Sequence, residues 1–199
     1  MNYLAHIYLS QGRKLVEIGN FAADSIKGKD FSRFPLEMQK GILLHRKIDY
    51  YTDSHPIVYK SAHRLFDEFR HYSTVIVDIF YDHFLAKNWK NYSAIPLDAY
   101  VQEFYSSLKR NHDILPKRVQ RFYPIMMEYN WLLSYAKIEG IEHILFQMNS
   151  RVKGRTQLDK SVNSLRENYA KYEEEFIAFF EELQAFSKEE LYQIDIGTV

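Results

Sequence analysis

The sequence contains no cysteine, and it has only seven glycines and five prolines in 199 residues. The absence of cysteine excludes disulfides, a thiolate nucleophile and cysteine-ligated zinc, so any metal site must use His, Asp and Glu. Such an oxygen-rich site suits Mg²⁺, Mn²⁺ or Fe²⁺ better than structural zinc. The scarcity of glycine and proline leaves few breaks in the chain and favours helices.

Signals for membrane insertion and for several enzyme classes are also missing. The first ten residues lack a basic leader and precede the polar run 11–14, so we expect neither a signal peptide nor a membrane span, and we predict a cytoplasmic protein. There is no glycine-rich phosphate loop, no Gly-x-Ser-x-Gly elbow and no His-Glu-x-x-His motif. A pI near 7 without a dense basic stripe disfavours nucleic-acid binding.

The hydrophobic content of 46% is enough for one sizeable core, and we expect a single domain over residues 1–199. Apolar residues recur at spacings of three and four, which predicts an all-α, single-domain helical bundle. The predicted helices cover residues 3–10, 15–28, 35–53, 56–71, 73–89, 97–110, 116–138, 140–152 and 160–184. Gly140 and Gly154 mark predicted breaks between late helices.

The net charge is zero, but the charges are unevenly distributed. Residues 109–160 hold ten basic and five acidic residues, whereas residues 161–199 hold three basic and nine acidic ones. The middle of the chain therefore offers a basic surface to an acidic partner, or else these residues only form solvated helix faces.

The most informative segment is residues 41–53, which places His45 and Asp49 one helical turn apart in an apolar frame. Four residues along a helix leave two side chains only about 40° apart on one face. An imidazole and a carboxylate in that arrangement can bind one divalent cation or can form an ordinary hydrogen-bonded pair.

Two further segments repeat this spacing. Asp24 follows Asn20 by four residues, and Asp78 precedes Asp82 by four. Because a site in a helical protein is usually assembled from several helices, these side chains predict one shared divalent centre, although each carboxylate alone is more often a solvated surface group. Carboxylates in apolar surroundings need a cation or strong hydrogen-bond donors. The apolar residues around these side chains are Phe21, Ile42, Leu44, Ile48, Val77, Ile79 and Phe80.

The sequence leaves the roles of three basic side chains near these segments undecided. His83 follows Asp82 and points about 100° away from it on a helix, where it ligates, supports or merely packs. His6 is a similar case in the first predicted helix. Arg46 beside His45 can grip a phosphate or can pair with a carboxylate.

Four segments, in this order, resemble the acyl carrier protein phosphodiesterase family, also called acyl carrier protein hydrolase. They are Met-Asn-Tyr-Leu-Ala-His-Ile-Tyr-Leu-Ser at the start, Gly-Asn-Phe-Ala-Ala-Asp-Ser-Ile-Lys-Gly from residue 19, Gly-Ile-Leu-Leu-His-Arg-Lys-Ile-Asp-Tyr-Tyr-Thr-Asp from residue 41, and Asp-Ile-Phe-Tyr-Asp-His-Phe-Leu-Ala-Lys-Asn-Trp from residue 78. The resemblance implies a fold related to the HD-domain phosphohydrolases and a metal-dependent hydrolysis that favours Mn²⁺. Its substrate would be holo acyl carrier protein, which loses 4'-phosphopantetheine and leaves the apo form.

The resemblance also suggests residue roles. We expect metal ligands at Asp24, His45, Asp49 and Asp82, with Asp78 and His83 in the first or second shell. Arg46 would stabilise charge on phosphorus, and His83 or His6 would supply the leaving-group proton. This chain carries Asp82-His83 in the reverse order of an HD pair.

An acidic carrier protein would be attracted to the basic residues of the chain, and the sequence offers two alternative surfaces to bind it. One holds Lys27, Lys29 and Arg33; the other holds Lys109, Arg110, Lys117, Arg118, Arg121, Arg151, Lys153 and Arg155. Two alternative functions also remain: a metal phosphohydrolase acting on a nucleotide or other small phosphodiester, and a non-enzymatic helical binding module whose carboxylates are ion-paired.

Overall fold

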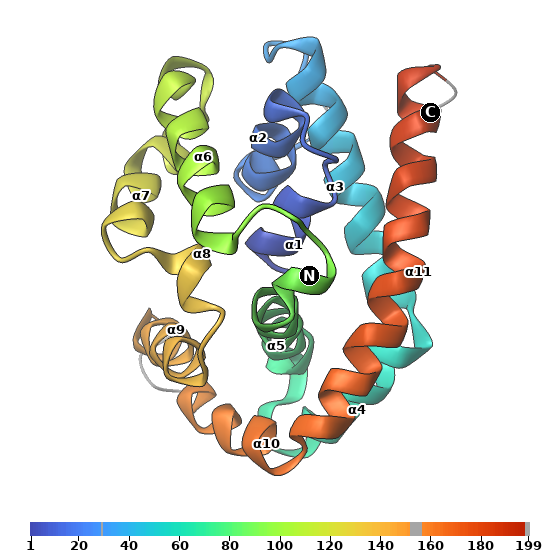
Figure 1. Cartoon of the computed structure of the whole chain (residues 1–199), viewed down its shortest axis with the longest axis vertical. Coiled ribbons are helices and arrows are strands. Elements are labelled where there is room, and N and C mark those ends of the chain that lie inside the picture. The colour runs from blue at the N-terminus through green and yellow to red at the C-terminus, as the bar shows by residue number, and fades with distance from the viewer. Residues whose placement is uncertain (29, 152–156, 198–199) are drawn as a thin grey trace.

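Every regular element of the described residues is helical, which confirms the predicted all-α fold (Figure 1). The computed structural model describes residues 1–28, 30–151 and 157–197, without the side chain of Arg151. Lys29, Lys153 and Arg155 lie outside this part, as does the predicted break at Gly154. The α-helices are α1 Tyr3–Tyr8, α2 Lys14–Ala22, α3 Leu36–Ser54, α4 Pro56–Phe69, α5 Ser73–Lys87, α6 Leu97–Arg110, α7 Lys117–Glu128, α8 Trp131–Ser134, α9 Ile138–Arg151, α10 Ser161–Glu167 and α11 Tyr169–Asp195.

The helix α5 forms the centre of the bundle, and it is buried along most of its length. It contacts α1, α4, α9 and α11, while the long α11 also packs along α3 (Figure 1). The side chains between these helices are largely aromatic, including Phe80, Tyr81, Phe84, Phe176 and Phe179. Burial of such large side chains is the main stabilising contribution to the fold.

The helices α2 and α3 pack closely because each contributes a glycine where they meet. A Cβ atom on Gly19 would lie 2.0 Å from the carbonyl oxygen of Met38, and one on Gly41 would lie 2.2 Å from that of Val16. No other residue fits at either position without moving the backbone. This close approach brings the end of α2, with Asn20, beside the face of α3 that carries His45 and Asp49.

Three of the predicted helices differ from those in the structure. The segment 116–138 breaks into α7 and α8 because Asn130 adopts a left-handed backbone conformation with φ 47°. The segment 160–184 breaks at Asn168, and the following helix α11 continues to Asp195. The helix predicted over 15–28 ends at Ala22, where a 3₁₀ turn over Ala23–Ser25 takes over.

Gly140 lies inside α9 instead of between two helices. A Cβ atom there would lie 2.0 Å from the carbonyl oxygen of Ser134, so the glycine allows α8 and α9 to touch. The glycine at this position therefore reflects a close packing contact between two helices and not a break between them.

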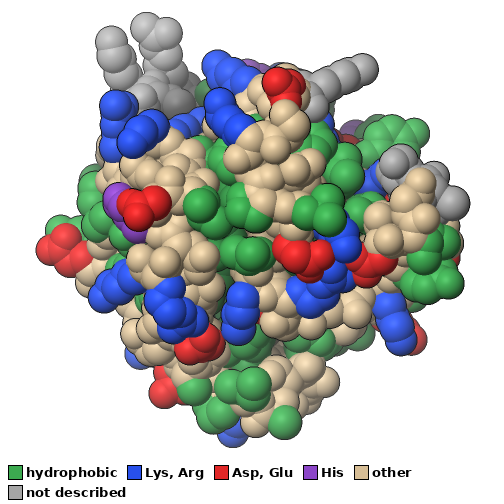
Figure 2. All heavy atoms as spheres, turned by 90° about the horizontal axis from the view of Figure 1, so that it is seen from above, with side chains coloured by type: hydrophobic (Ala, Val, Ile, Leu, Met, Phe, Trp, Pro, Cys, Tyr) green, Lys and Arg blue, Asp and Glu red, His purple; other side chains and the backbone are tan. Residues whose placement is uncertain are grey.

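Charges of both signs are interspersed on the face shown in Figure 2, which looks onto the end of the bundle that is uppermost in Figure 1. None of the described helices combines the length and the apolar character that crossing a membrane requires. The cytoplasmic location stays a prediction.

Candidate metal centre

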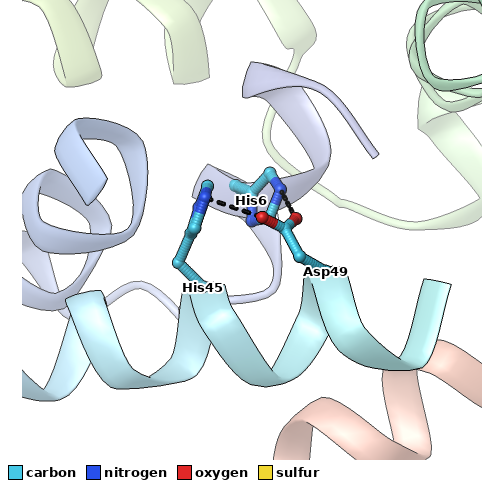
Figure 3. Close-up of side chains that lie close together, drawn as sticks. All are labelled: His6, His45 and Asp49. Atoms are coloured by element: carbon cyan, nitrogen blue, oxygen red, sulfur yellow. Dashed lines mark ion pairs between the residues drawn. The ribbon is translucent and has the colours of Figure 1, made fainter. Parts of the chain in front are cut away.

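Two histidines and one aspartate from α1 and α3 face one another (Figure 3). The Nε2 atom of His6 lies 3.2 Å from Asp49 Oδ1, and the Nε2 atom of His45 lies 3.0 Å from Asp49 Oδ2. One ligand atom from each residue falls within a span of 4.8 Å. The two imidazole rings stack with centroids 4.2 Å apart. This arrangement gathers two nitrogen donors and a carboxylate around one point.

The orientation of His6 is set by Asn20, which is fully buried at the end of α2. The Asn20 amide donates from Nδ2 to the His6 carbonyl oxygen at 2.8 Å and to Ser10 Oγ at 3.1 Å, so its Oδ1 accepts from His6 Nδ1 at 2.7 Å. The proton of a neutral His6 therefore lies on Nδ1, and the Nε2 lone pair points to Asp49.

The protonation state of His6 determines whether its contact with Asp49 is attractive or repulsive. Burial and the neighbouring His45 lower the pKa of His6, which favours the neutral ring. Two acceptors, the Nε2 lone pair and a carboxylate oxygen, then face each other at 3.2 Å. A cation between them removes this repulsion, so the donor set is suited to a metal ion.

His45 joins the group to Asp24, because its Nε2 lies 3.1 Å from Asp24 Oδ1. Burial opposes the charged imidazolium, but the hydrogen bonds and charges of Asp24 and Asp49 outweigh it and raise the pKa of His45 to about 9. The same contacts lower the pKa of Asp24, and they lower that of Asp49 despite its partial burial. In the metal-free protein, a proton on His45 neutralises part of this negative charge.

The donor set fits a divalent ion of the kind expected from the sequence. Two imidazoles with one or two carboxylates suit Mn²⁺ or Fe²⁺, and no cysteine is present to favour structural zinc. The side chain of Asp24 is 68% exposed and that of Asp49 is 41% exposed, so one side of the group opens to solvent. An open side is what a catalytic metal centre requires.

Asp82 and Asp78, predicted as ligands, have other partners in the structure. Asp82 is fully buried and accepts hydrogen bonds from the backbone N–H groups of Leu4 at 2.8 Å and Ala5 at 3.2 Å. Burial raises the pKa of Asp82 to about 7, and these two amides partly offset that effect. Asp78 accepts from the amino group of Met1 at 2.7 Å. Both carboxylates thus anchor the start of the chain, including the helix that carries His6.

His83 and Arg46 also lie outside the three-residue group. The ring nitrogens of His83 lie 2.7 Å from the carbonyl oxygen of Tyr135 and 2.8 Å from the hydroxyl of Tyr169, and the residue is buried. The Arg46 guanidinium donates to the carbonyl oxygen of Gly28 at 2.6 Å and lies over the ring of Phe31. Each side chain therefore has partners other than His6, His45 and Asp49.

Two features of the group were not anticipated. His6 was expected as a proton donor, but it lies among the potential ligands, and Asn20 was noted only for its spacing from Asp24. One feature of the sequence relates to the contact between His6 and Asn20: Ser10 follows His6 by four residues. In the structure, Ser10 Oγ donates to the His6 carbonyl oxygen and accepts a hydrogen bond from Asn20.

Comparisons with known proteins identify the family of the chain. Residues 1–183 match the family model described as acyl carrier protein phosphodiesterase. The chain belongs to this family. Among curated proteins, it is 29% identical over 181 residues to the acyl carrier protein phosphodiesterase of Photorhabdus laumondii, covering 90% of this chain and 91% of that one. It is 31% identical over 188 residues to the one of Escherichia coli O157:H7, covering 93% and 96%. No solved structure matches the chain.

Membership of the acyl carrier protein phosphodiesterase family makes the chain an enzyme that hydrolyses phosphodiester bonds. It removes the non-enzymatic binding module from the alternatives. The resemblance to the HD-domain phosphohydrolases stays a prediction, as do the roles of the individual site residues.

Proposed function

We propose that this enzyme hydrolyses the phosphodiester between the serine of holo acyl carrier protein and its 4'-phosphopantetheine arm, at a divalent metal centre held by His6, His45 and Asp49. The observation that carries the proposal is the group of facing donors on α1 and α3, in a chain whose relatives are named acyl carrier protein phosphodiesterases. Among metals we favour Mn²⁺, because the donors mix imidazole nitrogen and carboxylate oxygen.

The reaction consumes one water. Its oxygen forms a bond to phosphorus, the bond from phosphorus to the serine oxygen breaks, and a proton from the water ends on that serine oxygen. The products are the apo carrier and free 4'-phosphopantetheine. When bound, a divalent ion supplies Lewis acidity and lowers the pKa of a coordinated water.

The residues of the chain prepare this chemistry in three ways. Asn20 holds His6 with its Nε2 lone pair directed at Asp49, so the donors are oriented before an ion arrives. His45 gives up its proton when it ligates, which couples metal binding to proton release. Asp24, exposed at the edge of the group, completes the ligand set or orients the attacking water from the solvent side.

The test is to incubate the purified enzyme with holo acyl carrier protein, with Mn²⁺ and separately with EDTA, and to follow the intact mass of the carrier. We expect loss of the phosphopantetheine arm only with metal. An unchanged carrier mass in the presence of Mn²⁺ would overturn the proposal, and hydrolysis of a nucleotide phosphodiester by the same sample would then support the alternative substrate.

Metal binding has a readout that does not depend on turnover. Mn²⁺ added to the EDTA-treated protein should raise its melting temperature, because a ligand that binds only the folded state stabilises it. The increase should be lost in Asp49→Asn and retained in Asp67→Asn, an exposed aspartate on α4.

A further inference from the structure

Two pockets meet beside the metal centre. One has a volume of about 290 Å³ and is lined by Met1, Val75, Ile144 and Met148 with the side-chain amides of Asn2 and Gln147; we call it the methionine pocket. The other has a volume of about 330 Å³ and is lined by Phe21, Ser25, Phe122 and two arginines, Arg118 and Arg121; we call it the arginine pocket. Tyr3, Asp24 and Trp131 line both pockets. Asp24 also contacts His45, so the side shared by the two pockets lies next to the proposed metal centre.

The arginine pocket holds two arginines that are not ion-paired with any of the described carboxylates, although Asp24 also lines the pocket. Arg118 and Arg121 lie one turn apart on α7, are exposed, and form no ion pair or hydrogen bond with another of the described residues. Other arginines are engaged: Arg110 lies 2.7 Å from Glu103, and Arg64 lies 2.7 Å from Glu175. Two guanidinium groups without partners at one pocket favour a ligand that brings carboxylates.

The methionine pocket has the opposite character. No Lys or Arg is among its lining residues. Of the two carboxylates that border it, Asp78 is paired with the amino group of Met1, and Asp24 borders the arginine pocket as well. The methionine pocket therefore offers an acidic protein surface no arginine or lysine to pair with. Its apolar wall and the two amide side chains instead suit a slender, uncharged group that carries amides of its own.

We infer that the two pockets fix the direction in which the substrate crosses the metal centre, with the acidic carrier protein over the arginine pocket and the pantetheine arm in the methionine pocket. The inference rests on the proposed function. The two halves of the substrate have matching chemistry: the carrier is strongly acidic, whereas the arm beyond its phosphate is uncharged and contains two amides. Among the basic surfaces expected from the sequence, this assignment selects Arg118 and Arg121.

The test crosses two variants with three substrates. The substrates are holo acyl carrier protein, the p-nitrophenyl ester of 4'-phosphopantetheine, which has the arm but no protein, and bis(p-nitrophenyl) phosphate, which has neither. The first variant combines Arg118→Gln and Arg121→Gln. Its charge-matched control combines Arg166→Gln and Lys171→Gln, two exposed basic side chains on α10 and α11 that lie outside both candidate carrier surfaces and contribute little stability.

The arginine variant should raise KM for holo carrier about tenfold and weaken its dependence on salt, while both small substrates are cleaved as by the wild type. The control pair should keep most of the affinity for the carrier. A carrier KM that changes no more in the arginine variant than in the control pair would overturn this half of the inference.

The second variant is Ile144→Trp, which fills the methionine pocket, with Ile177→Trp on the exposed face of α11 as its control. We expect kcat/KM to fall about tenfold for the two substrates that carry the arm and to stay unchanged for bis(p-nitrophenyl) phosphate. Ile144→Phe gives a smaller block of the same pocket and should give a smaller loss. Equal rates of wild type and Ile144→Trp on the arm-bearing substrates would overturn the inference.

The outcomes also separate this inference from the proposed function. A wild-type enzyme that leaves holo carrier intact removes both. A wild-type enzyme that cleaves it, but whose two variants exchange their effects or show none, removes only the assigned direction.

Discussion

Two histidine–aspartate pairs in this molecule lie on apolar helices, yet the structure treats them differently. His45 and Asp49, with His6 beside them, turn nitrogen and oxygen atoms toward one another on a side that opens to solvent. Asp82 and His83 are buried, and the structure gives their polar atoms backbone and tyrosine partners. A nitrogen or oxygen atom can therefore bind a metal ion when its neighbours are other potential ligands, whereas an atom whose hydrogen bonds are already made by backbone or tyrosine groups supports the fold.

The sharpest way to break this comparison is to remove one carboxylate and one histidine in separate variants. Asp49→Asn should lower turnover of holo carrier by more than about 100-fold, beyond the 10- to 100-fold cost typical of residues that only support ligands. His83→Gln should leave the turnover of the folded enzyme nearly unchanged and lower its melting temperature instead. Rates measured with carrier mass, alongside circular dichroism, distinguish the two effects. Equal loss of turnover in both variants would contradict the comparison.

The role of Asp82 is tested by its stability effect. Asp82→Ala leaves the N–H groups of Leu4 and Ala5 without their acceptor, and a buried unpaired donor costs about 1–3 kcal/mol. With two donors left unpaired, the free energy of unfolding from urea titration should fall by at least about 1–3 kcal/mol, in EDTA as well as in Mn²⁺. A loss of stability seen only with metal present would instead indicate that Asp82 is a ligand.

A smaller effect on metal binding is expected at Asn20, which is hydrogen-bonded to His6 but is not itself one of the proposed metal ligands. Asn20→Leu removes the acceptor for His6 Nδ1 and should weaken Mn²⁺ binding by about tenfold, the lower end of what supporting partners contribute. Asn20→Asp keeps an acceptor and should retain more of the affinity. Calorimetric titration with Mn²⁺ measures both. Unaltered affinity in Asn20→Leu would show that His6 is not a ligand oriented in this way.

A further effect is the pH dependence of the stability of the metal-free protein. The pKa of His45 is about 9 in the folded state, against about 6.5 in an unfolded chain. A raised pKa means that the folded state binds the extra proton, so this stabilisation is complete below pH of about 6.5 and is lost as pH rises through about 9.

The melting temperature in EDTA should therefore exceed that of His45→Gln most at low pH, and the difference should shrink as pH rises through about 9. His63→Gln, an exposed histidine on α4, serves as the control. A difference that stays constant across this range would contradict the charged state assigned to His45.

The sequence predicted the fold class and the pairing of His45 with Asp49, because both follow from helical spacing within one segment. It also indicated Asp24, which the 3₁₀ turn after α2 brings against His45. It did not distinguish the roles of Asp82 and His83, because their backbone and tyrosine partners come from residues 52 or more positions away along the chain. The sequence did not group His6 with His45 and Asp49 for the same reason: only the packing of α1 against α2 and α3 shows which way its ring points.

The direct test of the metal centre is pulsed electron paramagnetic resonance of the Mn²⁺-loaded enzyme, which detects nitrogen atoms bound to the ion. We expect modulation from the imidazole nitrogens of His6 and His45, reduced in His6→Gln and unchanged in His83→Gln. A spectrum without nitrogen modulation, or one in which the modulation disappears with His83, would contradict the proposed metal centre.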